Sequence, residues 1–327
     1  MALAVSDKNR FRLTVFFLFF VCLVFCGCTP APLLSQREII HAVFFQQQGS
    51  TSRVLLLLAD STQAAEKNTP AYRTVSGRGR TSAQALDEAE SKLDGQVFYG
   101  LLDLAVLPAE YDWQQIQDLG RLLYEKTKPS PQITVFLLEN GNNCSEQTVP
   151  DLYTDIENIC KRYGIKNGLQ QLFSLEKECA LPVWQGTGYG FMFLQENQAD
   201  TVVSEPLAAQ MCAVLCGQGD RIDTTFLQGN AAVQAQAVFR HEVDNAGVNQ
   251  LRLVLSDLQI QNLQDSRQET SSLQNELYGE LQHAFSNLIQ QIYTSDFDPL
   301  RTKVWFSAVH GVSTQPTAPQ LSVYFEP

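Results

Sequence analysis

The sequence contains little of what enzymes commonly use for catalysis or for holding metal ions. It has only four histidines in 327 residues, and none of them lies at metal-ligand spacing from a cysteine. It has no GxSxG nucleophile elbow and no Walker motif. His241-Glu242-Val243-Asp244 lacks the second histidine of HExxH, so we interpret this segment as the solvated tip of a strand. We therefore expect no enzymatic activity, no catalytic residue, no cofactor and no bound metal.

Basic side chains are also few. The chain has 23 lysines and arginines against 35 aspartates and glutamates, which gives a formal net charge of −12. Residues 1–27 hold three basic side chains and one acidic side chain, so the chain from Cys28 onward has 20 and 34, a net charge near −14. This balance argues against a nucleic-acid partner and against lying flat on anionic lipid through charge attraction.

Long apolar runs are absent beyond the N-terminus. A helix needs about 20 residues to cross the hydrocarbon core of a membrane, whereas Leu55–Leu58 and Val135–Leu138 have only the length of a strand. The apolar run Leu13–Phe25 follows a short basic segment and is itself shorter than a typical spanning helix. A basic head followed by a short apolar run is the layout of a secretory signal peptide.

The end of that run predicts lipid attachment. Phe25-Cys26-Gly27-Cys28 has the form of a bacterial lipobox, in which the last cysteine receives diacylglycerol after residues 1–27 are removed. The alternative is an ordinary signal peptide with incidental cysteines. Each buried methylene adds about 0.8 kcal/mol, so two or more acyl chains, such as palmitate, hold a protein firmly. We expect Cys28 to be the single membrane attachment, on the extracytoplasmic face.

Five further cysteines are open to several interpretations. They are Cys144, Cys160, Cys179, Cys212 and Cys216. An exported location permits disulfides, and the odd number leaves at least one cysteine free or paired with another chain. Buried thiols, or one or two disulfides, are favoured over a metal site.

Residues 28–140 have the pattern of an N-terminal α/β domain. Arg37–Phe45 is apolar enough for a short helix or a buried strand. Alternating elements follow, with strands at Arg53–Ala59, Tyr72–Gly77, Val97–Leu107 and Gln132–Leu138 and helices at Ser82–Leu93 and Tyr111–Lys126. Thr81 is the expected N-cap of the first of these helices. This βαβαβ-like order predicts a sheet with parallel neighbouring strands.

The remainder divides into residues 141–200, a connecting segment or small middle domain, and residues 201–327, a C-terminal α+β domain. The middle segment has short helical patterns at Asp151–Tyr163 and Gly168–Glu178. In the C-terminal part, Pro206–Cys216 suits either a helix or a strand. Two antiparallel strands are expected at Ala231–Glu242 and Gln250–Gln264, joined by a turn at Asn245–Gly247, and a last strand pair at Lys303–Val309 and Gln320–Phe325. The predicted fold class is mixed α/β or α+β, with several domains.

The clearest helical periodicity lies at Leu273–Tyr293, where apolar residues repeat every three to four positions. We expect this stripe to pack in the core, with a groove for a partner as the alternative. His283 lies on the polar side and is expected at the surface. Two glycine-rich segments, Gly77-Arg78-Gly79-Arg80 and Gly186-Thr187-Gly188-Tyr189-Gly190, match no nucleotide-binding motif and are interpreted as turns.

The stretch Ser76–Leu107 resembles the hallmark stretch of the Ger(x)C family. In that family a glycine and a threonine open a helix, an aromatic–glycine step follows, and an apolar strand comes next. The matching positions here are Gly79, Thr81, Ala85, Phe98, Tyr99, Gly100, Leu104 and Val106. Arg37-Glu38-Ile39, the strand Gln132–Glu139 and the long C-terminal helix with Ser295-Asp296-Phe297 after it also resemble family features. Thr29-Pro30 and Leu101 replace residues usual in the family, which indicates a divergent member.

The resemblance implies a non-catalytic spore germination lipoprotein, the C component of a nutrient germinant receptor. Such a protein would be anchored to the outer surface of the spore inner membrane beside two integral membrane subunits. Its implied fold is multi-domain and mixed α/β. The alternative is an exported lipoprotein that binds a solute or a cell-wall fragment, which would have a deep pocket with convergent polar groups. A receptor subunit would instead have a flat apolar surface patch.

Overall fold

The structure is a computed structural model that describes residues 37–60, 71–128, 130, 132–139, 144–173, 178–186, 188–195, 201–227, 230–243, 249–263, 270–293, 302–310 and 318–326. The chain divides into two compact units, Met1–Arg37 and Glu38–Pro327, and the second unit contains the fold described below. The predicted signal peptide, Cys28, and the predicted turn at Asn245–Gly247 lie outside the described residues.

Nine of the described strands form a first sheet in the order β3-β2-β1-β5-β6-β7-β8-β9, with β4 paired to β1. Their bounds are β1 (Arg37–Gln48), β2 (Thr51–Ala59), β3 (Tyr72–Gly79), β4 (Gln96–Phe98), β5 (Leu104–Pro108), β6 (Thr134–Leu138), β7 (Glu178–Trp184), β8 (Tyr189–Gln195) and β9 (Thr201–Val203). The central strands β1, β5, β6 and β7 run parallel, and the flanking strands pair antiparallel. The prediction of parallel neighbours is confirmed.

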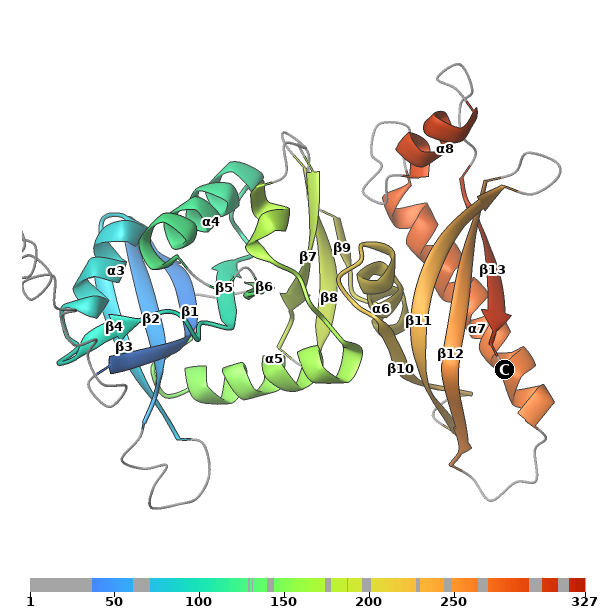
Figure 1. Cartoon of the computed structure of the whole chain (residues 1–327), viewed down its shortest axis with the longest axis horizontal. Helices are drawn as coiled ribbons and strands as arrows, with labels where there is room; N and C mark the ends of the chain where they lie inside the picture. The colour runs from blue at the N-terminus through green and yellow to red at the C-terminus, as the bar shows by residue number, and fades with distance from the viewer. Residues whose placement is uncertain are drawn as a thin grey trace, which may run out of the picture. The chain divides into compact units, whose positions relative to one another are not determined.

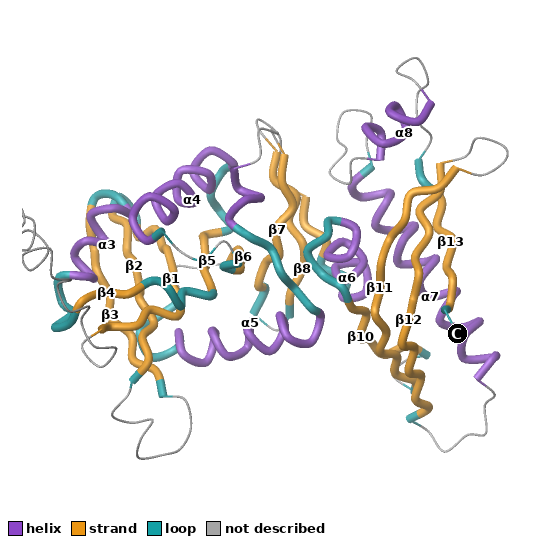
Figure 2. Tube along the Cα trace, viewed as in Figure 1, coloured by secondary structure: helices purple, strands orange, loops and turns teal. Residues whose placement is uncertain are grey.

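Helices cover both faces of the first sheet (Figures 1 and 2). Helices α3 (Ser82–Glu90) and α4 (Trp113–Thr127) and the 3₁₀ turn η3 (Leu169–Phe173) enclose one apolar core against it. Helices α5 (Val149–Tyr163) and α6 (Pro206–Leu215) belong to the core on the other face. Strands buried on both faces need near-continuous apolar runs, which explains why Val54 through Leu58 of β2 are all fully buried.

The first glycine-rich segment lies in strand β3 and not in a turn, so that interpretation was wrong. Helix α3 packs directly on this strand, and a Cβ atom added at Gly77 would collide with the carbonyl oxygen of Ala85. A Cβ atom at Gly79 would lie 2.6 Å from the amide nitrogen of Ala85. Thr81 caps the helix as predicted, because its hydroxyl accepts a hydrogen bond from the amide of Gln84 at 3.2 Å. Both glycines are therefore required by close helix-to-strand packing.

The second sheet has four described strands in the order β10-β11-β12-β13. Their bounds are β10 (Arg221–Phe226), β11 (Ala231–Val243), β12 (Asn249–Asn262) and β13 (Gln320–Phe325). The predicted antiparallel pairing of β11 with β12 is confirmed, whereas β13 pairs parallel with β12. Helix α7 (Thr270–Ile292) covers one face. Its apolar stripe is buried in the core as expected, from Leu273 and Leu277 through to Ile292.

Three predictions about single elements were wrong. Residues predicted as a strand at Lys303–Val309 form helix α8 (Thr302–His310), in which Trp305 stacks on His241 of β11 at a centroid distance of 4.9 Å. Val97–Leu107 is not one strand, because a turn that contains Gly100 separates β4 from β5. In the segment Gly168–Glu178, residues Leu169–Phe173 form the 3₁₀ turn η3 and Glu178 begins β7, while residues 174–177 lie outside the described residues. Short apolar runs suit helix and strand equally, so periodicity could not decide these cases.

The ambiguous segment Pro206–Cys216 is helix α6. Almost all of its side chains are buried, from Leu207 through Val214. A helix that is apolar on all sides lies inside a protein. It contacts β8, β10, β11 and α7, so this helix joins the core of the first sheet to that of the second.

Two buried amide side chains complete the first sheet where β6 and β7 separate. The main-chain amide of Val135 donates to Asn167 Oδ1 at 2.7 Å, and Asn167 Nδ2 donates back to the carbonyl of Val135 at 2.9 Å. Asn167 Nδ2 also donates to Gln218 Oε1 at 3.1 Å, and Gln218 Nε2 donates to the carbonyl of Ala180. We call Asn167 and Gln218 the amide bridge. Main-chain pairing between β6 and β7 is present only at Leu137 and Leu138. At Val135 and Ala180 the side chains of the amide bridge take the place of that pairing.

The predicted division of the chain does not follow the sheet. Strands β7 and β8 come from the predicted middle segment 141–200, yet both are hydrogen-bonded members of the first sheet. The parts 28–140, 141–200 and 201–327 stay a prediction about domain organisation. The prediction of a mixed α/β fold, with a parallel N-terminal unit and a C-terminal mixed sheet carrying a long amphipathic helix, is confirmed.

Candidate functional site

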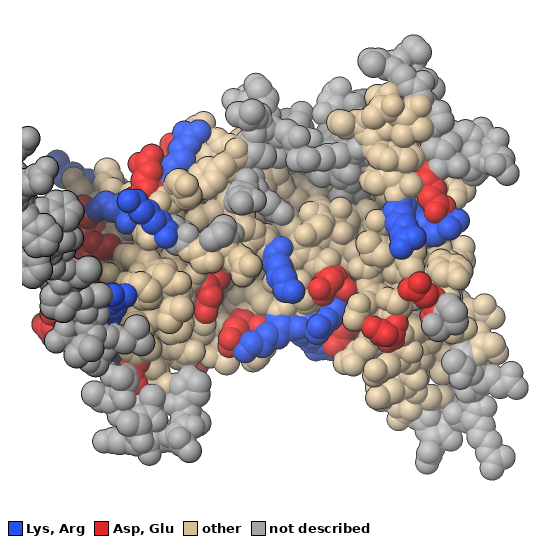
Figure 3. Space-filling view, viewed as in Figure 1, with Lys and Arg blue, Asp and Glu red and all other residues tan. Residues whose placement is uncertain are grey.

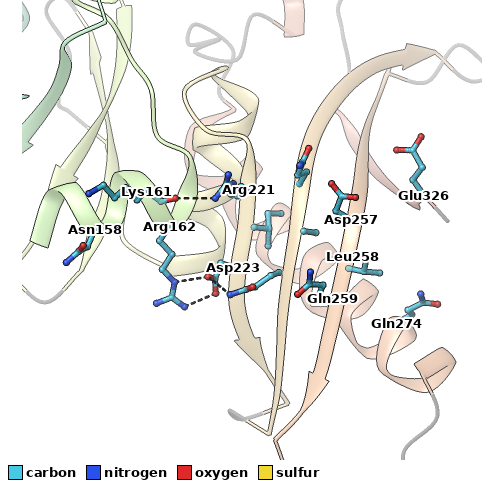
Figure 4. A pocket seen from close by; sticks show the side chains of 14 residues that line it. Asn158, Lys161, Arg162, Arg221, Asp223, Asp257, Leu258, Gln259, Gln274 and Glu326 are labelled. Carbon is cyan, nitrogen blue, oxygen red and sulfur yellow. Dashed lines mark hydrogen bonds and ion pairs between the residues drawn. The ribbon is translucent and has the colours of Figure 1, made fainter. Parts of the chain in front are cut away.

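A broad groove of about 1160 Å³ lies between the C-terminal end of helix α5 and the second sheet (Figure 4). Its wall on the α5 side has basic side chains, and the opposite wall has two carboxylates (Figure 4). The basic residues are Lys161, Arg162 and Arg221, and the carboxylates are Asp257 and Glu326 on the opposite wall together with Asp223 on β10. Glutamines 234, 236 and 259 supply amide groups. The lining is therefore polar, with both signs of charge.

Arg162 and Asp223 hold helix α5 to strand β10. Arg162 Nε and Nη2 donate to the two carboxylate oxygens of Asp223 at 2.9 and 2.7 Å. Asp223 also accepts from Gln234 Nε2 at 3.1 Å, and its main-chain amide donates to the buried Gln210 Oε1 at 2.8 Å. The hydrogen bonds with Asp223 raise the pKa of the Arg162 guanidinium. Such bidentate pairs have a fixed geometry, so this pair acts first as a structural connection.

The other basic side chains of the groove also have partners within the protein. Lys161 Nζ lies 2.6 Å from Glu157, which raises the lysine pKa. Arg221 Nη1 donates to the carbonyl of Lys161 at 3.4 Å, and its Nε lies 3.6 Å from Asp220. Figure 3 likewise shows basic and acidic side chains side by side. The groove is thus a mixed-charge surface and not a strongly cationic one.

Asp257 marks an irregularity in strand β12. The register between β11 and β12 shifts between Gln234 and Gln236, and Asp257 has a φ of 50°. The positive φ belongs to a β-bulge, which bends the strand and redirects its side chains. Aspartate tolerates this conformation better than most residues. Asp257 and Leu258, which lie at this bulge, both line the groove.

A smaller cavity of about 470 Å³ adjoins the groove, and Asn158 and Arg162 line both. It lies between α5, the start of β8 and the start of α6, and its other lining residues include Tyr163, Tyr189 and Pro206. The rings of Tyr163 and Tyr189 have centroids 5.0 Å apart at an interplanar angle of 38°. Burial raises the pKa of both phenols. The second glycine-rich segment contributes Gly188.

The second sheet has a face that no described element covers. Val238 of β11, Val254 of β12 and Tyr324 of β13 occupy paired positions, so their side chains lie in one row across three strands. Val238 and Tyr324 are about half exposed, at 47% and 50%, whereas Val254 between them is only 5% exposed. We call this row the open-face row. The neighbouring row holds Arg240 and Arg252, and Arg252 Nη2 lies 2.7 Å from Glu242.

A cluster of ionisable side chains lies at the start of strand β5. The Tyr153 hydroxyl donates to Asp103 Oδ2 at 2.9 Å, and His41 Nδ1 lies 3.7 Å from the same oxygen. The ring of Tyr72 meets those of His41 and Tyr153 edge-on. Burial raises the pKa values of Tyr72 and Tyr153. His41 belongs to β1, Tyr72 to β3 and Tyr153 to α5. The cluster therefore connects two strands of the first sheet to a helix that covers it.

Four of the cysteines, namely Cys144, Cys160, Cys179 and Cys212, are free thiols. Burial raises the pKa of Cys160 to about 12 and raises that of Cys212 well above its ordinary value. Cys216 ends helix α6, and its amide donates to the carbonyl of Cys212. Within the described ranges, no group of three or more His, Cys, Asp or Glu side chains could hold a metal ion.

The sequence singled out few of the residues that line these surfaces. Cys28 lies outside the described residues. His283 is exposed, as predicted, while Glu242 pairs with Arg252 on the second sheet. Gly186 adopts a φ of 89°, as a turn glycine does, and Gly190 lies in strand β8. Arg162 and Tyr163 at the end of α5 and Tyr189 at the start of β8 were missed, because basic and aromatic residues at such positions are common in structural roles too.

The residues that carry the family resemblance have structural roles. Ala85 and Val106 are fully buried, and Leu104 is 4% exposed. The Tyr99 hydroxyl donates to Glu90 Oε1 at 2.6 Å, and the Phe98 ring lies against Gly100. This stretch therefore specifies how α3, β4 and β5 pack together, and it does not form a binding site by itself.

Comparison with known proteins finds similarity in structure but not in sequence. No family model matches the sequence, and no curated protein matches it significantly. The chain is similar to the crystal structure of the GerBC protein, with a TM-score of 0.46 and 9% identity, over 86% of this chain and 96% of that chain. Among the described helices, none is long and apolar enough to cross a membrane.

Proposed function

We propose that this protein is a non-catalytic, lipid-anchored subunit of a spore nutrient germinant receptor, and that it acts by docking to two integral membrane subunits. Acyl chains on Cys28 would hold it on the extracytoplasmic face of the membrane, which the resemblance implies to be the spore inner membrane. The observation that carries the docking role is the open-face row, Val238, Val254 and Tyr324. An apolar row on an otherwise uncovered sheet face is suited to a protein partner.

The open-face row fits docking better than a structural role in the isolated chain. Residues on the other face of the same strands, such as Leu253 and Leu255, are fully buried beneath α7. Val238 and Tyr324 gain little from burial as the protein stands, because about half of each side chain contacts solvent. A partner that covered them would remove this apolar area from water, at about 25 cal/mol for each Å².

The groove gives less support to the alternative, an exported lipoprotein that binds a solute or a wall fragment. Its guanidinium and ammonium groups already have partners in Asp223, Glu157 and Asp220. A ligand would have to compete with these contacts.

The anchor is tested by replacing Cys28. In the Cys28→Ala protein we expect loss of incorporated palmitate and release from the membrane fraction. The Cys26→Ala protein is the matched control, because it removes the neighbouring cysteine and leaves the predicted attachment residue. A Cys28→Ala protein that stayed membrane-bound, with its lipid label undiminished, would show that the anchor lies elsewhere.

Docking is tested by charging the open-face row. In the Val238→Asp protein we expect the two membrane subunits to be lost from affinity-purified receptor, while lipid labelling and the circular dichroism spectrum stay unchanged. Leu101→Asp is the matched control, because Leu101 is 50% exposed and belongs to the first-sheet part. Docking through this face is refuted if Val238→Asp retains both subunits, or if Leu101→Asp loses them to the same extent.

A further inference from the structure

The smaller cavity has the size and composition of a site for a small molecule. Its volume of about 470 Å³ lies in the range of about 300–1,000 Å³ that is typical of such sites. Tyr163, Tyr189, Ile159 and Pro206 supply apolar surface, and polar groups come from only a few residues. A largely apolar lining with a few polar groups is the usual form of a ligand pocket.

Tyr189 supplies an observation that points to a ligand. The residue is only 6% exposed, and its hydroxyl oxygen is buried with no hydrogen-bond partner in the described part of the chain. A buried polar group without a partner is costly, and native proteins rarely retain one without a reason. Because burial raises the pKa of this phenol, the hydroxyl keeps its proton and can donate it to an acceptor. An oxygen atom of a bound ligand would be such an acceptor.

Arg162 provides further donors at the same cavity. A guanidinium has five N–H groups, and Asp223 engages only those of Nε and Nη2. Nη1 makes no hydrogen bond to a described residue, and the Arg162 side chain is 54% exposed. The guanidinium lies 5.3 Å from the centre of the Tyr163 ring. Donors of Arg162 therefore lie beside an aromatic surface.

The lining excludes a cationic ligand. None of the described residues that line the cavity is an aspartate or a glutamate, so no described carboxylate would neutralise an amine there. Asp223 compensates much of the Arg162 charge, so hydrogen-bond donors select the ligand more than net charge does. Charge-assisted bonds to a carboxylate are about twice as strong as neutral ones, which favours a carboxylate over an amide.

We propose that the cavity between α5 and β8 binds a small carboxylate with an apolar or aromatic body. The carboxylate accepts hydrogen bonds from Tyr189 and Arg162, and the apolar body lies against Tyr163. This site does not depend on the docking role of the open-face row, which is on the second sheet.

The glycine-rich segment gives a way to block the site. A Cβ atom added at Gly188 would meet no atom within 4 Å, and Gly188 lines the cavity. At Gly190, by contrast, a Cβ atom would lie 2.6 Å from the carbonyl oxygen of Val203. Gly188→Leu can therefore occupy the cavity without a collision at Cβ, whereas a substitution at Gly190 would disturb the sheet.

The test measures binding of defined probes to the purified full-length protein by isothermal titration calorimetry. We expect benzoate to bind, benzamide to bind more weakly and benzylamine not to bind. Gly188→Leu should abolish benzoate binding, whereas Gly279→Leu should not. Gly279 lies on α7, where an added Cβ also meets nothing within 4 Å. Failure of benzoate to bind at millimolar concentration, equal binding of benzylamine, or unchanged binding to Gly188→Leu would overturn the proposal.

Tyr189→Phe separates a binding role from a structural one. The substitution removes the hydroxyl that has no partner, so the midpoint of thermal unfolding without benzoate should stay unchanged or rise. Benzoate affinity should fall about 10- to 150-fold, since a hydrogen bond to a charged group contributes about 1.5–3 kcal/mol. Unchanged affinity, or a lower unfolding midpoint without benzoate, would assign the hydroxyl a structural role and overturn this part of the proposal.

Discussion

The two sheets of this protein differ in how they are covered. The first sheet has helices on both faces, and its central strands are apolar on both sides. The second sheet has α7 on one face, while the open-face row lies on the other. A sheet covered on both faces has no surface left for a partner except its edges. The comparison indicates that the first sheet provides stability and that recognition belongs to the second sheet.

The largest difference should appear when one buried aromatic ring is removed from the first sheet. Phe136 in β6 is fully buried in the core on the face of the sheet that α5 and α6 cover. We expect Phe136→Ala to lower the free energy of unfolding by about 3–5 kcal/mol, through lost burial and the cavity left behind. Urea denaturation followed by circular dichroism measures this value. A loss below about 1 kcal/mol would contradict a first sheet that is tightly packed on both faces.

The amide bridge gives the next largest effect. Asn167→Ala would leave the amide and carbonyl groups of Val135 without their side-chain partner. We expect a loss of about 3 kcal/mol, because each buried unsatisfied group costs about 1–3 kcal/mol. The matched control is Asn158→Ala, which removes an amide that lines the surface groove. Equal losses for both variants in urea denaturation would show that the bridge adds no stability.

Alkaline pH should lower the free energy of unfolding through a buried cysteine thiol. Such thiols lie outside the strands of the second sheet, which contain no cysteine. Cys160 has a pKa near 12 in the folded protein because it is buried, against an ordinary value near 9. The folded state thus retains a proton that the unfolded state loses, so stability is complete below about pH 9 and falls from there to pH 12. The slope is about 1.4 kcal/mol per pH unit for this thiol. Cys160→Ser should have a flatter profile in urea denaturation at pH 8–10.5.

The smallest effect on stability is expected on the open face. Tyr324→Ala removes a ring that is 50% exposed, and surface substitutions usually change stability by less than about 0.5 kcal/mol. The same change should weaken docking to the membrane subunits in the purification assay described for Val238. A stability loss as large as that of Phe136→Ala would mean that this face is covered within the protein itself.

Much of the fold could be predicted because periodicity and caps are local. Thr81 capped its helix, and the stripe of α7 from Leu273 to Ile292 packed in the core as expected. The segment around Trp305 was misassigned because a short run of apolar residues carries no period that separates helix from strand. The start of β7 was missed since Glu178 follows a segment of mixed polarity.

The candidate sites were much harder to predict than the fold. Arg162, Tyr189 and Pro206 are far apart in the sequence and meet only through the packing of α5, β8 and α6. No local sequence pattern predicts contacts between residues so far apart. The open-face row is equally non-local, because strand register brings Val238, Val254 and Tyr324 together. The attachment residue Cys28 is the opposite case, because its signal is continuous in sequence; it stays a prediction.

The amide bridge also bears on the order in which the chain folds. Val135 obtains its partner from a residue 32 positions later, and the carbonyl of Ala180 obtains its partner 38 positions later, beyond helix α6. Strands β5 and β6 pair across the single crossover helix α4, whereas β7 is fully joined only after Gln218 has arrived. Closure of long loops is slow relative to local contacts. We therefore expect the burial of Trp184 at the end of β7 to lag behind helix formation during refolding, so that its fluorescence reports the completion of the sheet.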